Sequence, residues 1–163
     1  MSNVAANTDN TVRPLRPADL ERVIAIDSGH VGESRRRFFE KRLAHAQKHP
    51  EDFVHVGVAR KGALVGFAFA RILRGEFGRE QAIATLDAVG VEHDSRERGV
   101  GHALMDGLTK AMREKKVKSL QSQAEWTNHS LLRTFEAYGF GVASRLVLER
   151  SVLTPLAEPI EGE

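Results

Sequence analysis

The feature that most constrains this chain is a pair of glycines between an apolar stretch and an amphipathic one. Residues 83–91 (IATLDAVGV) are apolar enough for a buried strand. From Val100 to Met112, apolar residues recur at three- and four-residue steps, which is typical of one face of a helix. Gly99 and Gly101 therefore lie where a strand turns into a helix, whose first N–H groups have no intrahelical partner. Because the helix dipole is positive there and glycine carries no Cβ, this turn predicts a pyrophosphate site.

The spacing of these glycines excludes two other phosphate-binding loops. A Walker-type loop requires Lys-Ser or Lys-Thr after its last glycine, whereas His102 and Ala103 follow Gly101. The dinucleotide-binding fingerprint requires a third glycine at the position where this chain has Leu104. The predicted pyrophosphate site is therefore of a different type.

Length and composition limit the classes of protein to consider. With 163 residues, 41% of them hydrophobic and 28% charged, the chain is expected to form one domain with an ordinary core. No apolar run approaches the roughly 20 residues of a membrane-spanning helix, and we expect no secretory signal. The absence of cysteine excludes disulfides and thiolate catalysis and fits a cytoplasmic protein. A net charge of +2 is too small to argue for a nucleic-acid partner, so neither nucleic acid nor membrane is expected.

Taken in order, the chain predicts an α/β domain with a flexible segment at each end. Residues 1–11 are expected to be mobile and residues 153–163 to form a tail. The turn at Lys61-Gly62 predicts a hairpin, and Ser34 is a plausible N-cap. The predicted elements are a strand at 12–15, helices at 17–28 and 34–48, strands at 53–59, 63–72 and 83–91, a helix from 99, a weak strand at 118–124, a helix from 127 or 128 to Gly139, and an extended segment at 140–152, as one strand or a bent pair.

Two motifs resemble those of a known family. The form Arg96-x-x-Gly99-x-Gly101 after a strand resembles the acetyl-CoA loop of the GNAT family of N-acetyltransferases. The stretch from Asn128 through Phe135 to Gly139-Phe140 resembles that family's Asn…Tyr…Gly-Phe pattern. The resemblance covers about residues 12–152. It implies the GNAT acyl-CoA N-acyltransferase fold, a mixed, mostly antiparallel twisted sheet flanked by about four helices.

The resemblance also implies where acetyl-CoA would bind. In this family the fourth and fifth strands splay apart, and the backbone of Val89, Gly90 and Val91 would pair with the pantetheine arm. Asn128 would contact the pantetheine or the thioester, or cap its helix, or do both, and Phe135 also belongs to this set. The pyrophosphate would be held by Arg96, Glu97, Arg98, Gly99, Val100, Gly101 and His102.

The chemistry implied is direct attack of an amine on the thioester. A backbone N–H of the splayed strand would polarise the thioester carbonyl. Asp87 and Glu92 are the candidate bases; the alternatives are a buried ion pair for Asp87 and a surface position for Glu92. Period-two alternation places Asp87, Val89 and Val91 on one strand face and Glu92 on the other. His30 is a further candidate on the acceptor side, and its alternative is a surface loop residue. Trp126 is another, and its alternative is a core residue.

The chain departs from the family where a phenol commonly protonates the leaving sulfur, because Phe135 holds that position. Three explanations remain: the thiolate leaves unaided, Tyr138 or a histidine replaces the phenol, or the protein binds acyl-CoA without turnover. Tyr138 is alternatively a core aromatic. We expect an N-acetyltransferase that moves an acetyl group to a small-molecule or peptide primary amine, without a metal. The alternative is a non-catalytic acyl-CoA-binding module. A homodimer that shares its C-terminal strand would suit the family.

Overall fold

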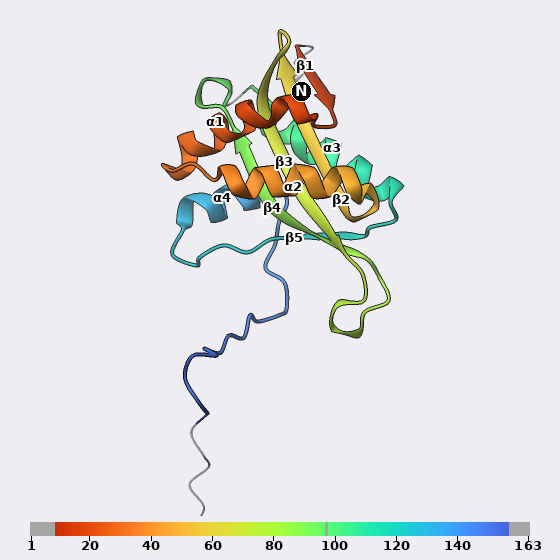
Figure 1. Ribbon diagram of the computed structural model, residues 1–163, viewed down its shortest axis with the longest axis vertical. Helices are drawn as coiled ribbons and strands as arrows, with labels where there is room; N and C mark the ends of the chain where they lie inside the picture. The colour runs from red at the N-terminus through yellow and green to blue at the C-terminus, as the bar shows by residue number, and fades with distance from the viewer. Residues whose placement is uncertain (1–8, 97, 157–163) are drawn as a thin grey trace, which may run out of the picture.

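The computed structural model describes residues 9–96 and 98–156 of the chain (Figure 1). The predicted order of elements is confirmed as far as the last helix, and four short 3-10 turns lie between the larger elements. The strands and helices are β1 (Asn10–Arg13), α1 (Leu20–Val31), α2 (Arg36–Lys48), β2 (Phe53–Arg60), β3 (Ala63–Leu73), β4 (Ile83–Val91), α3 (Val100–Glu114), β5 (Ser119–Gln121) and α4 (His129–Ala137).

The five strands form one mixed sheet in the order β1-β2-β3-β4-β5. The first four strands pair antiparallel, and β5 runs parallel to β4 because α3 crosses over between them. The predicted hairpin turn is confirmed, with φ of 49° at Lys61 and 80° at Gly62, which is the left-handed pair that a two-residue hairpin favours. The expected α/β fold with a mostly antiparallel sheet and four helices is therefore present.

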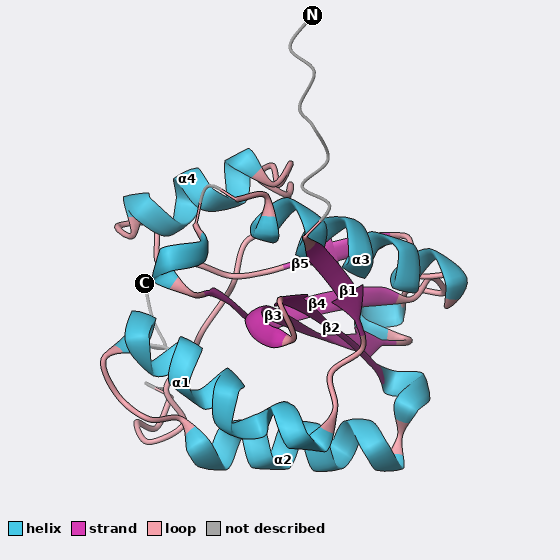
Figure 2. Ribbon diagram, turned by 90° about the horizontal axis from the view of Figure 1, so that it is seen from above, coloured by secondary structure: helices cyan, strands magenta, loops and turns pink. Residues whose placement is uncertain are grey.

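The helices cover both faces of the sheet. Figure 2 shows α1 and α2 on one face and α3 and α4 on the other. On the first face, Phe39 of α2 packs against Phe67 and Phe69 of β3. On the second face, Leu104 and Leu108 of α3 are fully buried against the sheet. The apolar period predicted from Val100 onward is thus the buried stripe of α3.

β4 carries a bulge and then separates from β5. Ala88 pairs with Phe69 while Leu86 pairs with Ala70, so Asp87 is an extra residue without a partner on β3. On its other side, β4 pairs with β5 only from Ile83 to Thr85. The backbone from Leu86 to Val91 therefore has an edge that no strand covers among the described residues. This is the splayed arrangement that the family resemblance implied.

The bulge corrects one sequence prediction. Strict alternation placed Asp87 on the same face as Val89 and Val91. In the structure, Val89 and Val91 pack on the α3 side, whereas Asp87 forms an ion pair with Arg42 of α2. An extra residue in a strand shifts the alternation by one, and side chains beyond it change faces.

Three other expectations about local structure were wrong. The N-cap position of α2 is Arg35 rather than Ser34, and its side chain makes no capping hydrogen bond. α1 continues through Gly29 and His30 to Val31 and ends at Gly32, which has a φ of 82°. The extended segment at 140–152 forms no strand among the described residues. It runs away from the body in Figure 1, with large apolar side chains exposed.

Candidate active site

The predicted phosphate loop lies between the end of β4 and the start of α3. Gly99 is the N-cap of α3 with a φ of 76°, a left-handed conformation that favours glycine. Its carbonyl accepts the first helical hydrogen bond, from the N–H of Ala103 (3.0 Å). The N–H groups of Val100, Gly101 and His102 therefore precede the first intrahelical bond. Glu97, also predicted for this loop, lies outside the described residues.

Side chains from distant segments hold this loop in place. The Val100 side chain is buried in the core, so only its backbone is available to a ligand. Asn10, at the start of β1, donates from Nδ2 to the carbonyl of Arg98 (3.1 Å). Arg96 donates from Nη2 to Nδ1 of His30 (2.8 Å). The loop is therefore fixed at both ends before any ligand arrives.

His30 connects α1 to this loop and to β4. Because a guanidinium can only donate, Nδ1 of His30 is the acceptor and Nε2 carries the proton. That Nε2–H donates to the carbonyl of Val91 (2.6 Å), at the uncovered end of β4. The ring of His93 lies 4.8 Å from that of His30, and its Nε2 is 3.2 Å from the carbonyl of Gly29. His30 is therefore part of the site and not an isolated loop residue.

The structure provides a packing reason for Gly101 and Gly90 that the sequence did not show. A Cβ at Gly101 would lie 1.8 Å from the hydroxyl of Tyr138 and 2.6 Å from its Cζ. A Cβ at Gly90 would lie 2.7 Å from the Phe67 ring. The ring of His102 also contacts that of Tyr138, with centroids 5.7 Å apart. Tyr138 therefore lies against the first turn of α3, and burial raises the pKa of its phenol, opposed in part by Arg96.

The two candidate carboxylates of β4 differ in their partners. Glu92 follows the strand and is paired with Arg22 of α1, and Ser95 Oγ lies 3.4 Å from its other oxygen. Asp87 lies under α2 with Oδ2 3.3 Å from Nη2 of Arg42. That contact is an ion pair without hydrogen-bond geometry, so buried Oδ2 has no hydrogen-bond partner among the described residues. The predicted ion pair of Asp87 is present, and its arginine comes from α2 rather than from a neighbouring strand.

The C-terminal motif has mixed outcomes. Asn128 caps α4, with its side chain accepting from the N–H of Leu131 (3.2 Å), so the capping interpretation is confirmed. Phe135 packs beside Phe140, with ring centroids 4.9 Å apart, on the edge of the α3-side core. Trp126 is 82% exposed, so its interpretation as a core residue was wrong. A contact of Asn128 or Phe135 with a ligand remains a prediction.

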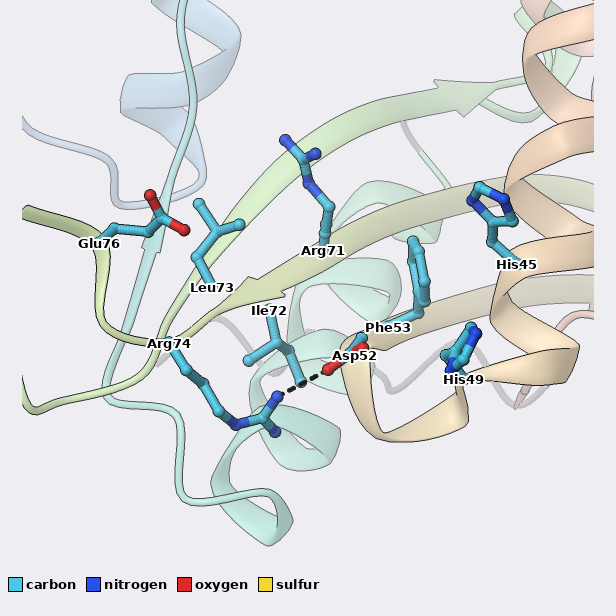
Figure 3. Close-up of a pocket in the computed structure, with 9 residues that line it drawn as sticks. All are labelled: His45, His49, Asp52, Phe53, Arg71, Ile72, Leu73, Arg74 and Glu76. Carbon is cyan, nitrogen blue, oxygen red and sulfur yellow. Dashed lines mark hydrogen bonds and ion pairs between the residues drawn. The ribbon is translucent and has the colours of Figure 1, made fainter.

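The sequence analysis missed a cavity of about 470 Å³ between α2 and the end of β3 (Figure 3). Arg71 lines it together with His45 of α2, His49 just after α2, Phe53 of β2 and Glu76 after β3. Nε of Arg71 is buried and has no hydrogen-bond partner among the described residues. In the sequence, the one signal for this cavity was Arg71, an arginine in an otherwise apolar strand.

Nothing in the described parts of the chain argues for a metal centre or a membrane span. His49, Glu51 and Asp52 place possible ligand atoms within 4.8 Å of one another, but the group is largely exposed. Asp52 is also engaged by Arg74 (2.9 Å) and Glu51 lies 3.4 Å from His49. Of the helices described, none has the length and apolar character required to cross a bilayer.

Comparisons with known proteins agree with this geometry. The model of the acetyltransferase (GNAT) family matches residues 20–140. The ribosomal protein bS18-alanine N-acetyltransferase of Escherichia coli strain K12 is 22% identical over 135 residues, 83% of each chain. The aminoglycoside acetyltransferase AAC(6')-Iy, solved with a CoA bisubstrate analogue, is 18% identical with a TM-score of 0.68, covering 87% of this chain and 97% of its own.

A transcriptional regulator from Bacillus halodurans C-125 has the same fold, with a TM-score of 0.72 and 18% identity over 87% of this chain and 99% of its own. At such identities the solved structures establish the fold alone. The family model covers most of the chain, including β4, the glycine loop, α3 and α4. This chain therefore belongs to the GNAT family of acetyltransferases.

Proposed function

We propose that this protein transfers the acetyl group of acetyl-CoA to a primary amine by direct attack on the thioester. The observation that carries the proposal is the uncovered edge of β4 beyond Thr85, which leads directly into the glycine loop and the N-terminus of α3. An extended pantetheine arm pairs with such an edge as an added strand does. The N–H groups that precede the first bond of α3 suit the pyrophosphate at its end.

The residues present fit this co-substrate. Left-handed Gly99 turns the chain so that the free N–H groups of α3 follow the end of β4. Arg96 is held beside the loop by His30 and adds a positive charge there. Bound acetyl-CoA supplies an activated carbonyl and a thiolate leaving group. Asn128 and Phe135 stay assigned to the thioester end of the site, with Val89, Gly90 and Val91 along the pantetheine arm.

Asp87 is the base that the surroundings support best. Its side chain lies on the α2 side at the bulge, where β4 continues without β5, and its Oδ2 has an ion pair with Arg42 (3.3 Å) but no hydrogen bond among the described residues. As the amine nitrogen forms its bond to the acetyl carbon, the carbon–sulfur bond breaks and the amine proton passes to Asp87. Glu92 is the alternative base, but both of its carboxylate oxygens already have hydrogen-bond donors, from Arg22 and Ser95.

Phe135 occupies the position where the family usually has a phenol and carries no transferable proton. Tyr138 follows three residues later, but its hydroxyl lies against Gly101, in the loop assigned to the pyrophosphate and not to the thioester. A thiol of pKa about 8.5 gives a fair leaving group. In the proposed reaction the thiolate therefore leaves without a dedicated proton donor.

Release of free CoA from acetyl-CoA tests the proposal directly. The chain contains no cysteine, so a thiol reagent reports only the CoA that the reaction releases. We expect amine-dependent release from a panel of small amines, amino acids and peptides. If CoA raises the melting temperature but no amine increases release, the non-catalytic acyl-CoA-binding alternative replaces the enzyme. Phe135, in the position where the family usually has a phenol, is the observation that favours this alternative.

A further inference from the structure

Two buried polar atoms on the α2 face of the sheet have no hydrogen-bond partner among the described residues. One is Nε of Arg71 on β3, and the other is Oδ2 of Asp87 on β4. The first is a donor on a cation and the second is an acceptor on an anion. Because an unsatisfied polar group is unfavourable away from water, both atoms are candidates to bind a polar ligand, although Oδ2 of Asp87 already has its ion pair with Arg42.

Arg71 lines the cavity and Asp87 does not, but the two residues lie near each other on neighbouring strands. Arg71 pairs across the sheet with Thr85, two residues before Asp87 on β4, which is about 7 Å along a strand. α2 spans the same interval on the outside. Its Arg42 pairs with Asp87, and its His45, three residues later, lines the cavity that Arg71 also lines. Both atoms therefore lie beneath one turn of α2.

Of the two arginines that line the cavity, Arg71 is the one without an ion pair among the described residues. Arg74 lines the same cavity, but it donates to Asp52 (2.9 Å) and to the carbonyl of Glu51 (3.0 Å). In Figure 3 the guanidinium of Arg71 points away from that ion pair. No hydrogen bond or ion pair of Arg71 occurs within the described residues. A guanidinium in this state offers a planar fork of donors to a carboxylate.

We propose that the acceptor carries a carboxylate as well as its amine, with Arg71 binding the carboxylate and Asp87 the amine. This inference depends on the proposed acetyltransferase function, because it assigns the acceptor of that reaction. A carboxylate fits better than a phosphate ester, since one unpaired guanidinium balances one negative charge. Glu76 in the same lining would repel a dianion.

Matched pairs of acceptors test this assignment. The probes are amino acids of increasing length, from glycine to 6-aminohexanoate, each compared with its carboxamide, and tripeptides that carry glutamate or glutamine. Initial rates of CoA release give kcat/KM for each acceptor. We expect the best acid to exceed its amide by about 10-fold or more, which is typical for loss of one charge-assisted hydrogen-bonded pair.

Substitutions of the two arginines of the cavity provide the control. Arg71→Gln is expected to lower kcat/KM for the acid by about 10- to 100-fold, mainly through KM, and to leave the amide and the affinity for CoA unchanged. Arg71→Lys should retain part of the preference. Arg74→Gln, at the same cavity but with its guanidinium held by Asp52, should retain all of it.

The outcomes separate this inference from the proposed function. Equal rates for acid and amide, turnover of carboxylate-free amines alone, or an unchanged preference in Arg71→Gln would each overturn the carboxylate site while amine acetylation stands. If no amine of any kind releases CoA, the acetyltransferase proposal itself fails, and the inference fails with it.

Discussion

Replacing Gly101 by alanine separates two explanations for a glycine at this position. The sequence predicts that a Cβ would crowd a bound phosphate. The structure adds that the same Cβ would lie 1.8 Å from the Tyr138 hydroxyl, whereas ordinary contact begins at 3.4 Å. Tyr138 would have to retreat by about 1.6 Å, and overpacking of this kind costs about 1–3 kcal/mol. α4 carries Tyr138 at its end, so we expect Gly101→Ala to loosen α4 from the body.

The double variant with Tyr138→Ala tests the packing explanation. Without the phenol the steric conflict disappears, and alanine is favoured over glycine in a helix by up to about 1 kcal/mol. The coupling free energy between the two sites is therefore expected to be about 2 kcal/mol, measured by urea denaturation of the four variants. Hydrogen exchange of the α4 amides is the second measurement, because α4 can detach without global unfolding.

Affinity for CoA, measured by calorimetry, tests the phosphate explanation in the same four proteins. If the Cβ acts only by displacing Tyr138, Gly101→Ala weakens CoA binding in the wild-type background and not in Tyr138→Ala. If the Cβ crowds the phosphate, both backgrounds lose affinity equally. Zero coupling in stability together with equal losses of CoA affinity would refute the packing explanation.

Three further predictions concern other parts of the chain. Arg13 lowers the pKa of Asp19 by a side-chain hydrogen bond. The ion pair therefore stabilises the fold fully above the unfolded-state pKa of Asp19, near 4, and this stabilisation is lost as the pH falls through the folded-state pKa. Asp19→Asn should lower the free energy of unfolding, measured with urea, by about 2 kcal/mol at pH 7 and by much less at pH 3. Tyr138→Phe should leave kcat at saturating substrates unchanged, because its hydroxyl lies at the phosphate loop. A fall of about 100-fold would show instead that this phenol protonates the departing sulfur. Because Leu146 and Leu148 are exposed, we expect the protein to form a dimer, measured by light scattering, and Leu146→Glu to be monomeric. A monomer at about 100 μM wild-type protein would contradict this prediction.

Prediction from sequence succeeded where the signal was local. The bounds of β4 were predicted exactly as they occur, because residues 83–91 form an apolar run between polar segments. The start of α3 was predicted from Gly99 and Gly101 and from the regular spacing of the apolar residues after them. The segment at 140–152 has an equally suitable composition for a strand, yet forms none among the described residues. A strand also needs an edge to pair with, and composition carries no information about that edge.

The site contacts that were missed all join residues far apart in the chain. His30 reaches Arg96 and Val91 across more than sixty positions, and no periodicity within either segment reports that contact. Arg42 of α2 pairs with Asp87 of β4 across forty-five positions, because α2 covers this face of the sheet. Such contacts depend on the assembled sheet, so single-sequence patterns cannot show them.

Asp87 shows how one backbone irregularity lets a strand carry a charge without losing its apolar contacts. Ala84 and Leu86 pack on the α3 side, so ordinary alternation places Asp87 on the α2 side, where Arg42 balances its charge. In a regular strand, Val89 and Val91 would follow Asp87 to that side. The bulge shifts the alternation by one residue, so Val89 and Val91 pack on the α3 side instead. The same bulge lies just beyond the last residue that pairs with β5. One extra residue in β4 therefore allows a paired carboxylate on the α2 side and apolar contacts on the α3 side within the same short stretch.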